Sequence, residues 1–333
     1  MPSLREQREQ LERQLIGPHG LASADSRGRE TPEEPDGIRT CFQRDIDRIT
    51  HSKAFRRLKH KTQVFLQPEG DHYRTRLTHT LEVTRLARTV ARSLRLNEDL
   101  AEAVGLGHDL GHTPFGHAGE RALRDITGDF QHYEQSLRVV DRLEKGGAGL
   151  NLCYETRMGI LNHTYGAPDD TAEATVVRLA DRIAYINHDL DDAMRAGILT
   201  EADVPPSIRQ KCGDRTSRRI DAIVTDLIEN SLDGDIRMSD GMARVFDEFH
   251  NFMFDAVYRN PSAKGEESKV HGILGGIFEH YIRNPDKLPR EYKAIAHADG
   301  IERAVCDYVA GMTDSYALAV YSDIFIPAAW SVK

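Results

Sequence analysis

The 333-residue sequence lacks any apolar stretch approaching the roughly 20 residues that a membrane-spanning helix needs. Its N-terminus, MPSLREQRE, is charged throughout and has none of the apolar core that a secretory signal peptide requires. The composition, 39% hydrophobic and 29% charged, is that of a soluble globular protein. We therefore expect a cytoplasmic protein without a membrane partner.

Cysteine is also scarce, and no two of the cysteines form a CxxC pair. Their spacing argues against both a zinc cluster and a disulfide framework. We expect reduced thiols at all four positions, which are Cys41, Cys153, Cys212 and Cys306.

Positive charge is in deficit overall, with a net charge of −9. This deficit disfavours a general nucleic-acid binder. The average hides one basic segment, residues 39–61, with eight basic residues against two acidic ones. Bidentate arginine contacts are the usual way to hold a polyphosphate, so several of these cations are candidates to receive one. The alternative is a solvated basic helix face.

Apolar residues recur at helical spacing along the chain, with no strong alternation of the kind that strands show. The sequence predicts an all-α protein: one domain over residues 1–333, with its core at about 38–196 and peripheral helices at about 1–17 and 204–333. Helices are predicted over residues 4–16, 42–65, 77–94, 98–109, from about 116, 132–143, 156–163, 171–196, 216–230, 240–257, 269–284 and, with a break at Gly311, 301–321. The predicted buried stripe of the 77–94 helix consists of Leu77, Leu81, Leu86, Val90 and Leu94.

One short segment concentrates the side chains that can carry chemistry. Residues 105–120 read GLGHDLGHTPFGHAGE and contain three histidines and two acids. The adjacent His108 and Asp109 offer a divalent metal one imidazole nitrogen and one carboxylate oxygen. Two ligands do not hold a metal, and two further candidates lie on predicted helices, His79 before the pair and Asp181 after it.

This order of residues resembles the HD superfamily of metal-dependent phosphohydrolases. The sequence is most similar to its dGTPase-like deoxynucleoside triphosphate triphosphohydrolases, and the similarity covers most of the chain. Five ordered segments carry it: DIDRITHSKAFRRLKHKTQVF at 45–65, GDHYRTRLTH at 70–79, residues 105–120, FQHYEQSLR at 130–138 and VAGMTDSYA at 309–317. The resemblance implies an HD-domain helical bundle that hydrolyses dGTP or several dNTPs to deoxynucleoside and tripolyphosphate.

The resemblance also implies roles for individual residues. The four proposed metal ligands are His79, His108, Asp109 and Asp181. A helix beginning near Gly116 would place His117 and Glu120 on one face, and the family assigns this pair the acid and base roles. Substrate contacts are implied for Gln63, Arg76, His112, His132, Arg182, Tyr185 and Asp189.

A ligand set of two histidines and two aspartates, without a thiolate, suits Mn²⁺, Mg²⁺, Co²⁺, Ni²⁺ or Fe²⁺ as well as zinc. On the 171–196 helix, polar residues recur at intervals of three or four and form a stripe on an otherwise apolar element: Asp181, Tyr185, His188 or Asp189, and Asp192. Burying carboxylates without partners is costly, so a metal and a polar substrate facing the stripe would compensate it. In the family, the last motif lies near the nucleoside, which makes Asp314 and Tyr316 site candidates; core packing is the alternative.

Two other interpretations stay open. The first is a phosphohydrolase for another ester, such as a nucleoside monophosphate, an alarmone or a cyclic nucleotide. The second is a catalytically silent sensor of nucleotides or single-stranded nucleic acid, and such a molecule could also be an effector of the enzyme. A homo-oligomer is expected by resemblance.

Overall fold

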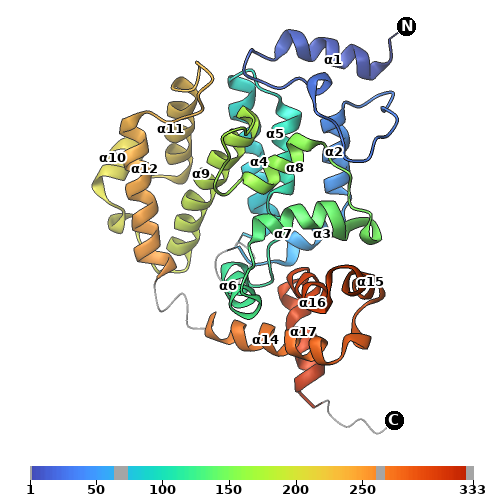
Figure 1. The fold of residues 1–333 in the computed structure, drawn as a ribbon. Coiled ribbons are helices and arrows are strands. Elements are labelled where there is room, and N and C mark those ends of the chain that lie inside the picture. The colour runs from blue at the N-terminus through green and yellow to red at the C-terminus, as the bar shows by residue number, and fades with distance from the viewer. Residues whose placement is uncertain (1, 64–73, 260–266, 328–333) are drawn as a thin grey trace, which may run out of the picture. The chain divides into compact units, whose positions relative to one another are not determined.

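The computed structural model describes residues 2–63, 74–259 and 267–327 (Figure 1). Their secondary structure is helical, with two isolated antiparallel bridges, Arg29 with Cys153 and Thr62 with Thr75, and no strand among them. The predicted all-α class is confirmed. Residues 64–65 and 70–73 of the first two family motifs lie outside the described residues. No helix within these ranges combines the length and apolar character needed to cross a membrane.

Most helices lie where the apolar pattern predicts them. Their bounds are α1 Leu4–Leu15, α2 Cys41–Thr50, α3 Lys53–Arg57, α4 Arg76–Ser93, α5 Glu98–Gly107, α6 Gly116–Thr127, α7 His132–Arg138, α8 Tyr154–Asn162, α9 Ala172–Arg195, α10 Pro206–Cys212, α11 Thr216–Glu229, α12 Asp240–Met253, α14 Glu267–Arg283, α15 Arg290–Asp299, α16 Ile301–Ala310 and α17 Asp314–Phe325. Two π-helical turns, Val139–Leu143 and Phe254–Tyr258, extend α7 and α12.

The single helix predicted over residues 42–65 is wrong. The chain leaves the helix after Thr50, and the Ser52 side chain accepts a hydrogen bond from the Phe55 backbone N–H, which starts the separate helix α3. A serine that bonds to nearby backbone favours such a cap over a helix interior. Residues 61–63 consequently follow in non-helical backbone, and Lys61 and Gln63 are buried rather than spread along a solvated helix face.

The predicted buried stripe of α4 is wrong as well. Of its five residues only Val90 is buried, and Leu81 is 49% exposed. The buried side chains include Val83, Ala87 and Ala91, which are smaller. Helix α4 approaches α5 closely through Thr84, because a Cβ atom on Gly105 would lie only 2.8 Å from the Thr84 hydroxyl. A close helix contact of this kind favours small residues over leucines.

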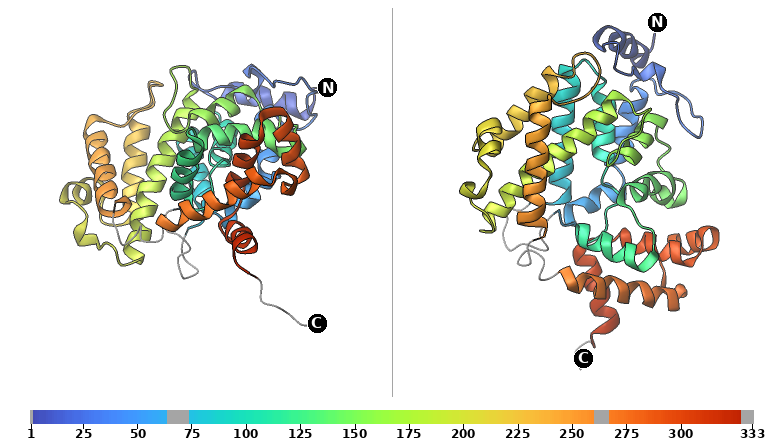
Figure 2. Two further views of the ribbon diagram at one scale, coloured as in Figure 1. Left: turned by 60° about the horizontal axis from the view of Figure 1, so that its bottom comes forward. Right: turned by 60° about the vertical axis from the view of Figure 1, so that its left-hand side comes forward.

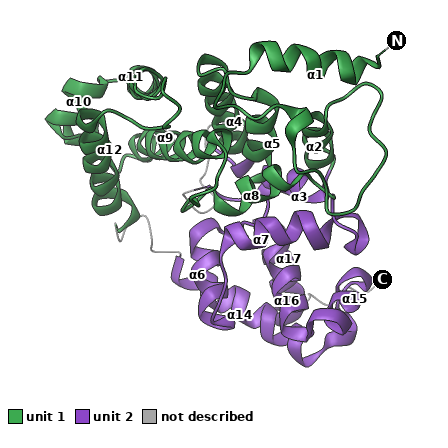
Figure 3. Ribbon diagram, turned by 45° about the horizontal axis from the view of Figure 1, so that its top comes forward, with its two compact units in different colours: residues 1–51, 78–108, 151–264 green, residues 52–77, 109–150, 265–333 purple. Residues whose placement is uncertain are grey.

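The chain divides into two compact units (Figure 3). Unit 1 consists of residues 1–51, 78–108 and 151–264, and unit 2 of residues 52–77, 109–150 and 265–333. The boundary passes between His108 and Asp109. The single-domain assignment stays a prediction.

Helix α5 is central to unit 1, where it packs against α2, α8 and α9. The Asn97 side chain caps it, as predicted, by accepting hydrogen bonds from the backbone of Asp99 and Leu100 at 3.0 and 3.2 Å. Helix α9 in turn contacts α11 and α12, which run beside it (Figure 2). These contacts fix the end of α5, where His108 follows, and the face of α9 that carries Asp181.

In unit 2, helices α6, α14, α16 and α17 share one apolar cluster. Leu123 from α6, Leu274 from α14, Val309 from α16 and Ala317 from α17 are fully buried in it. Phe115 joins the cluster one residue before α6 begins. The cluster therefore anchors α6, the helix that carries His117 and Glu120.

Candidate functional site

Three of the four predicted metal ligands lie together in unit 1. His79 comes from α4, His108 follows α5 directly and Asp181 comes from α9. Asp181 Oδ1 lies 3.0 Å from His79 Nε2 and 3.8 Å from His108 Nε2, and one ligand atom from each residue lies within 4.8 Å of the other two. Donors bound to one ion at ~2.0–2.2 Å are about 3 Å apart, so this geometry fits a divalent cation.

The buried imidazole of His108 is oriented by the backbone of its own helix. Its Nδ1 donates to the Gly105 carbonyl at 2.6 Å, which leaves Nε2 as the nitrogen that can ligate a metal. The His163 ring packs edge-on against it, with 5.1 Å between centroids, and His163 Nδ1 donates to the Ile160 carbonyl at 2.7 Å. His163 is buried beside the predicted ligands.

The fourth predicted ligand, Asp109, belongs to unit 2 and is buried there with Arg76. Arg76 Nη1 donates to Asp109 Oδ2 at 2.6 Å, and His112 Nε2 lies 3.4 Å from Asp109 Oδ1. Arg76 Nη2 also donates to the Thr62 carbonyl at 3.3 Å. The predicted phosphate contact Arg76 is thus fixed in place by a carboxylate and a carbonyl.

Three predicted substrate contacts of unit 2 have buried polar atoms that find no hydrogen-bond partner among the described residues. These atoms are Arg76 Nε, His112 Nδ1 and Gln63 Oε1. Native proteins pair the large majority of buried polar atoms, and each one left unpaired costs ~1–3 kcal/mol. Unpaired atoms on the side chains of three predicted contacts point to a polar ligand.

Glu120 organises the predicted catalytic residues. Its Oε1 accepts from the His132 backbone N–H and lies 3.0 Å from His132 Nδ1, while its Oε2 lies 3.5 Å from His117 Nδ1. The His132 ring stacks on that of His112 with 4.2 Å between centroids. His117 is exposed, whereas Glu120 is buried. The structure therefore brings four predicted residues into one cluster.

The environment sets the charge of this cluster. Burial alone would raise the pKa of Glu120, but hydrogen bonds from His117 and His132 outweigh it and hold that pKa far below its ordinary range. Burial, together with the neighbouring Arg76 and His132, lowers the pKa of His112 well below 6.5. At neutral pH, Glu120 is an anion and His112 is a neutral imidazole.

The polar stripe of α9 exists, and it has a partner that the sequence did not reveal. Asp189 is buried, and its Oδ2 accepts a hydrogen bond from the hydroxyl of Tyr258. Burial and the Asp189 charge raise the pKa of Tyr258 well above 10. Tyr258 ends the π-helical turn after α12, and nothing in its spacing relates it to Asp189.

The other two predicted contacts on α9 differ in their surroundings. The Tyr185 ring lies edge-on to His250 with 6.4 Å between centroids, and burial raises the pKa of its hydroxyl. The Arg182 guanidinium instead lies over the Phe246 ring, 5.4 Å from its centroid, and is 3.9 Å from Asp247. Arg182 is therefore held by α12, outside the buried stripe.

Much of the basic segment is neutralised locally. Arg44 and Arg48 both pair with Glu33, at 3.2 and 2.7 Å, and Arg39 pairs with Asp36 at 2.7 Å. These three arginines have protein partners, and the expectation that several cations of the segment receive a polyphosphate stays a prediction for the others.

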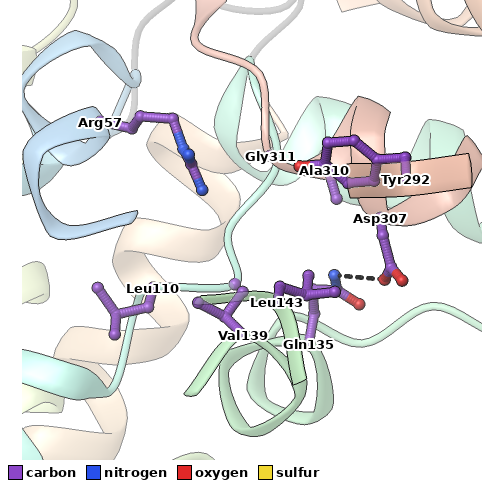
Figure 4. A pocket seen from close by; sticks show the side chains of 10 residues that line it. Arg57, Leu110, Gln135, Val139, Leu143, Tyr292, Asp307, Ala310 and Gly311 are labelled. Atoms are coloured by element: carbon purple, nitrogen blue, oxygen red, sulfur yellow. Dashed lines mark hydrogen bonds between the residues drawn. The ribbon is translucent and has the colours of Figure 1, made fainter. Parts of the chain in front are cut away.

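Arg57 of the same segment lines a hollow in unit 2, together with Tyr292 and Asp307 (Figure 4). The hollow measures about 210 Å³ counted out to its open mouth, and none of the predicted site residues lines it.

The sequence matches two known families. Residues 76–186 match the HD domain, and residues 236–323 match the phosphohydrolase-associated domain. One solved structure, of a hypothetical protein from Aquifex aeolicus, is similar over 84% of this chain and 71% of that chain. Its TM-score of 0.46 and sequence identity of 19% are too low to bear on function.

Curated relatives match over nearly their whole length. A deoxyguanosinetriphosphate triphosphohydrolase-like protein of Caldanaerobacter subterraneus subsp. tengcongensis is 52% identical, over 98% of this chain and 97% of its own. Proteins of the same description from Desulfatibacillum aliphaticivorans and Clostridium perfringens (strain 13 / Type A) are 49% and 47% identical, over 98% and 97% of this chain and 99% and 98% of theirs. The chain therefore belongs to the HD-domain family of deoxyguanosinetriphosphate triphosphohydrolase-like proteins.

Proposed function

We propose that the protein hydrolyses deoxynucleoside triphosphates, dGTP or several dNTPs, to deoxynucleoside and tripolyphosphate. The observation that supports this most directly is the set of buried, unpaired polar atoms on Arg76, His112 and Gln63. A nucleotide substrate offers acceptors for the guanidinium, and donors for the imidazole nitrogen and the amide oxygen. The names of the curated relatives support the triphosphate substrate class.

The proposed metal ligands are His79, His108 and Asp181, with Asp109 next to His108 in the chain. Two imidazoles and two carboxylates form a mixed donor set that suits Mn²⁺, Mg²⁺, Co²⁺, Ni²⁺ or Fe²⁺. When bound, such an ion supplies Lewis-acid polarisation of a phosphoryl oxygen and lowers the pKa of a water molecule.

The other predicted site residues would bind the substrate and move protons. Water adds to the α-phosphorus and the bond to the sugar 5′ oxygen breaks, so that tripolyphosphate leaves intact. His117, held by Glu120, is the group that exchanges a proton with water or the leaving oxygen. Arg76 donates hydrogen bonds to phosphate oxygens, and the neutral His112 contacts the substrate beside it.

The sugar end of the substrate would meet the other predicted contacts. Asp189, fixed by Tyr258, accepts a hydrogen bond from a sugar hydroxyl, with Tyr185 on the same helix. The sugar contact of Gln63, in unit 2, stays a prediction from the resemblance. A cytoplasmic location, a homo-oligomer and an effector that is a nucleotide or single-stranded nucleic acid stay predictions from the sequence.

Phosphorus NMR of the products from each of the four dNTPs, with Mn²⁺ or Mg²⁺, tests the proposal. We expect tripolyphosphate from the wild-type protein and none from Asp181→Asn. The matched control is Asp191→Asn, which changes the same side chain on the same helix outside the proposed site, and it should behave as wild type. Pyrophosphate or orthophosphate as the product would indicate a different phosphohydrolase. No turnover of any dNTP, alone or with a second nucleotide present, would favour another ester or a sensor.

A graded-salt binding measurement with single-stranded DNA addresses the sensor alternative. Contacts to a phosphate backbone weaken steeply as salt rises. Tight, salt-sensitive binding without any turnover would replace the enzyme proposal by the sensor.

A further inference from the structure

Helix α6 begins at a backbone turn that most side chains avoid. Phe115 has φ 64° and ψ 24°, and Gly116 follows with φ 55°. The left-handed conformation is strained for a residue other than glycine. The turn sets the direction of α6, and with it His117 and Glu120 in the first turns of that helix.

The carboxylate of Asp314, the first residue of α17, holds this turn from 199 residues away. Its Oδ1 accepts from the Phe115 backbone N–H at 2.8 Å. Its Oδ2 accepts from the backbone N–H and the hydroxyl of Thr62 at 3.0 and 2.5 Å. Asp314 is 5% exposed, so these three donors are what stabilise its buried charge.

Lys61 provides a second connection between the same two parts of unit 2. Its buried ammonium donates to the carbonyl of His112 and, at 2.9 Å, to that of Ala310. Lys61 and Asp314 therefore tie both ends of residues 112–115 to residues 310–314. Gly111, next to the first stretch, and Ala310 and Gly311 of the second also line the hollow of Figure 4.

Thr62 extends this connection to the substrate contacts. Its backbone carbonyl accepts from Arg76 Nη2, while its N–H and hydroxyl are held by Asp314. The Phe115–Gly116 turn also packs closely on Gln63, the residue after Thr62, since a Cβ atom on Gly116 would lie 3.2 Å from the Gln63 carbonyl oxygen. The Asp314 carboxylate thus fixes two pieces of backbone. One is Thr62, which precedes Gln63 and accepts from Arg76, and the other is the turn that begins α6.

We propose that Asp314 is a positioning residue, which holds the Phe115–Gly116 turn and Thr62 so that His117, Glu120 and Arg76 keep their working arrangement. The inference rests on the proposed function for its kinetic consequence, but the contacts themselves are independent of it. The positioning role differs from core packing, because Asp314 contributes hydrogen-bond acceptors rather than apolar volume. It differs also from a nucleoside contact, because all three bonds go to the protein.

Asp314→Asn tests the proposal with almost no change in volume. The amide can replace one acceptor oxygen, but its NH₂ group cannot accept from Thr62. We expect kcat to fall about tenfold to hundredfold, the range for small misplacement of reacting groups, with a smaller change in KM. Asp323→Asn is the matched control, because Asp323 is exposed on the same helix, and it should leave both constants unchanged.

Two further variants keep the test valid if Asp314→Asn unfolds. Thr62→Val removes only the hydroxyl donor and should lower kcat less, while Thr62→Ser, which retains it, should restore activity. Thr62→Val and Thr62→Ser enzymes with the same kcat would overturn the proposal. A loss in Asp314→Asn that is no larger than its unfolded fraction would do the same.

Amide hydrogen exchange read by mass spectrometry separates this proposal from the proposed function. Peptides covering residues 112–119 should exchange faster in Asp314→Asn than in wild type, and Asp323→Asn should not change them. Unchanged exchange in Asp314→Asn overturns the positioning role. Faster exchange in a protein that hydrolyses no dNTP would retain the contact and reject only the activity.

Discussion

Glu120 is the residue whose chemistry is most clearly defined by its contacts. One carboxylate binds the backbone and ring of His132 with one oxygen and faces His117 with the other. Glu120→Gln keeps the volume, but the amide cannot accept on both sides. We expect kcat to fall by ~10²–10⁴, the usual contribution of acid–base catalysis, as measured by tripolyphosphate release.

Glu134→Gln is the control for this variant, because Glu134 is exposed on the neighbouring helix α7. It should retain wild-type kcat. Full turnover by Glu120→Gln would remove Glu120 from the mechanism.

Lys61 makes stability depend on pH in a defined direction. Burial, and the charge of Arg57, lower its pKa well below 10.5 in the folded protein, whereas an unfolded lysine titrates near ~10.4. Between these two values the unfolded chain binds more protons than the folded one, so stability rises with pH. Lys61→Met should lower stability through its lost hydrogen bonds and remove this rise.

Urea unfolding at intervals from neutral pH towards ~10 measures the effect. The quantity to compare is the difference in unfolding free energy between wild type and Lys61→Met, because groups common to both proteins cancel in it. A difference that stays constant over this range would show that Lys61 is charged to the same extent in both states.

Helix positions could be predicted where a cap and an apolar period agree, as at Asn97 and α5. Helices α10 and α15 are absent from the predicted helices, and each begins at or directly after a proline, Pro206 or Pro289. Proline is well suited to the first helical turn, where its missing N–H costs nothing. The buried face of α4 could not be predicted, since it depends on where Gly105 permits close contact.

The site residues likewise divide into those that could be predicted from the sequence and those that could not. The triad of His79, His108 and Asp181 and the Glu120 cluster could be predicted because the resemblance to a known family implies roles at these positions. Tyr258 carries none, because its bond to Asp189 spans 69 residues and depends on how α12 packs on α9. The pairing of Arg44 and Arg48 with Glu33 was equally invisible, since it arises from a loop that returns to α2.

The loop before α6 depends on a glycine at position 111. A Cβ atom there would lie 2.1 Å from the Ser136 backbone nitrogen, 2.4 Å from the Gln135 carbonyl carbon and 2.5 Å from the His132 carbonyl oxygen. These are backbone atoms of α7 and cannot rotate away. We expect Gly111→Ala to destabilise the protein by about 2–4 kcal/mol in denaturant unfolding, at or above the usual cost of overpacking.

Gly272→Ala is the opposite case. A Cβ atom on Gly272, inside α14, would meet nothing within 4 Å. Alanine in that helix should stabilise the protein by about 1 kcal/mol. If Gly111→Ala and Gly272→Ala changed the free energy of unfolding equally, steric contact would not be the reason for glycine at position 111.

At the scale of the whole molecule, the three proposed metal ligands of unit 1 predict that stability and metal binding are linked. His79, His108 and Asp181 come from three helical elements of unit 1 that are distant in sequence, so the unfolded chain offers no comparable site. A ligand that binds only the folded state adds ~2.7 kcal/mol at a concentration of 100 Kd. Mn²⁺ should therefore raise Tm and a chelator should lower it again.

Variants of α9 locate the ion that produces this shift. Asp181→Asn should lose the Mn²⁺ dependence of Tm, because an amide is a much weaker ligand than a carboxylate, while Asp191→Asn should keep it. The measurement needs no substrate, so it tests the metal site separately from hydrolysis. If Mn²⁺ raised the Tm of Asp181→Asn as much as that of wild type, the ion would be bound elsewhere. The three residues would then need another reason to lie together, since two imidazoles and a carboxylate at these distances are a group that could hold a metal ion.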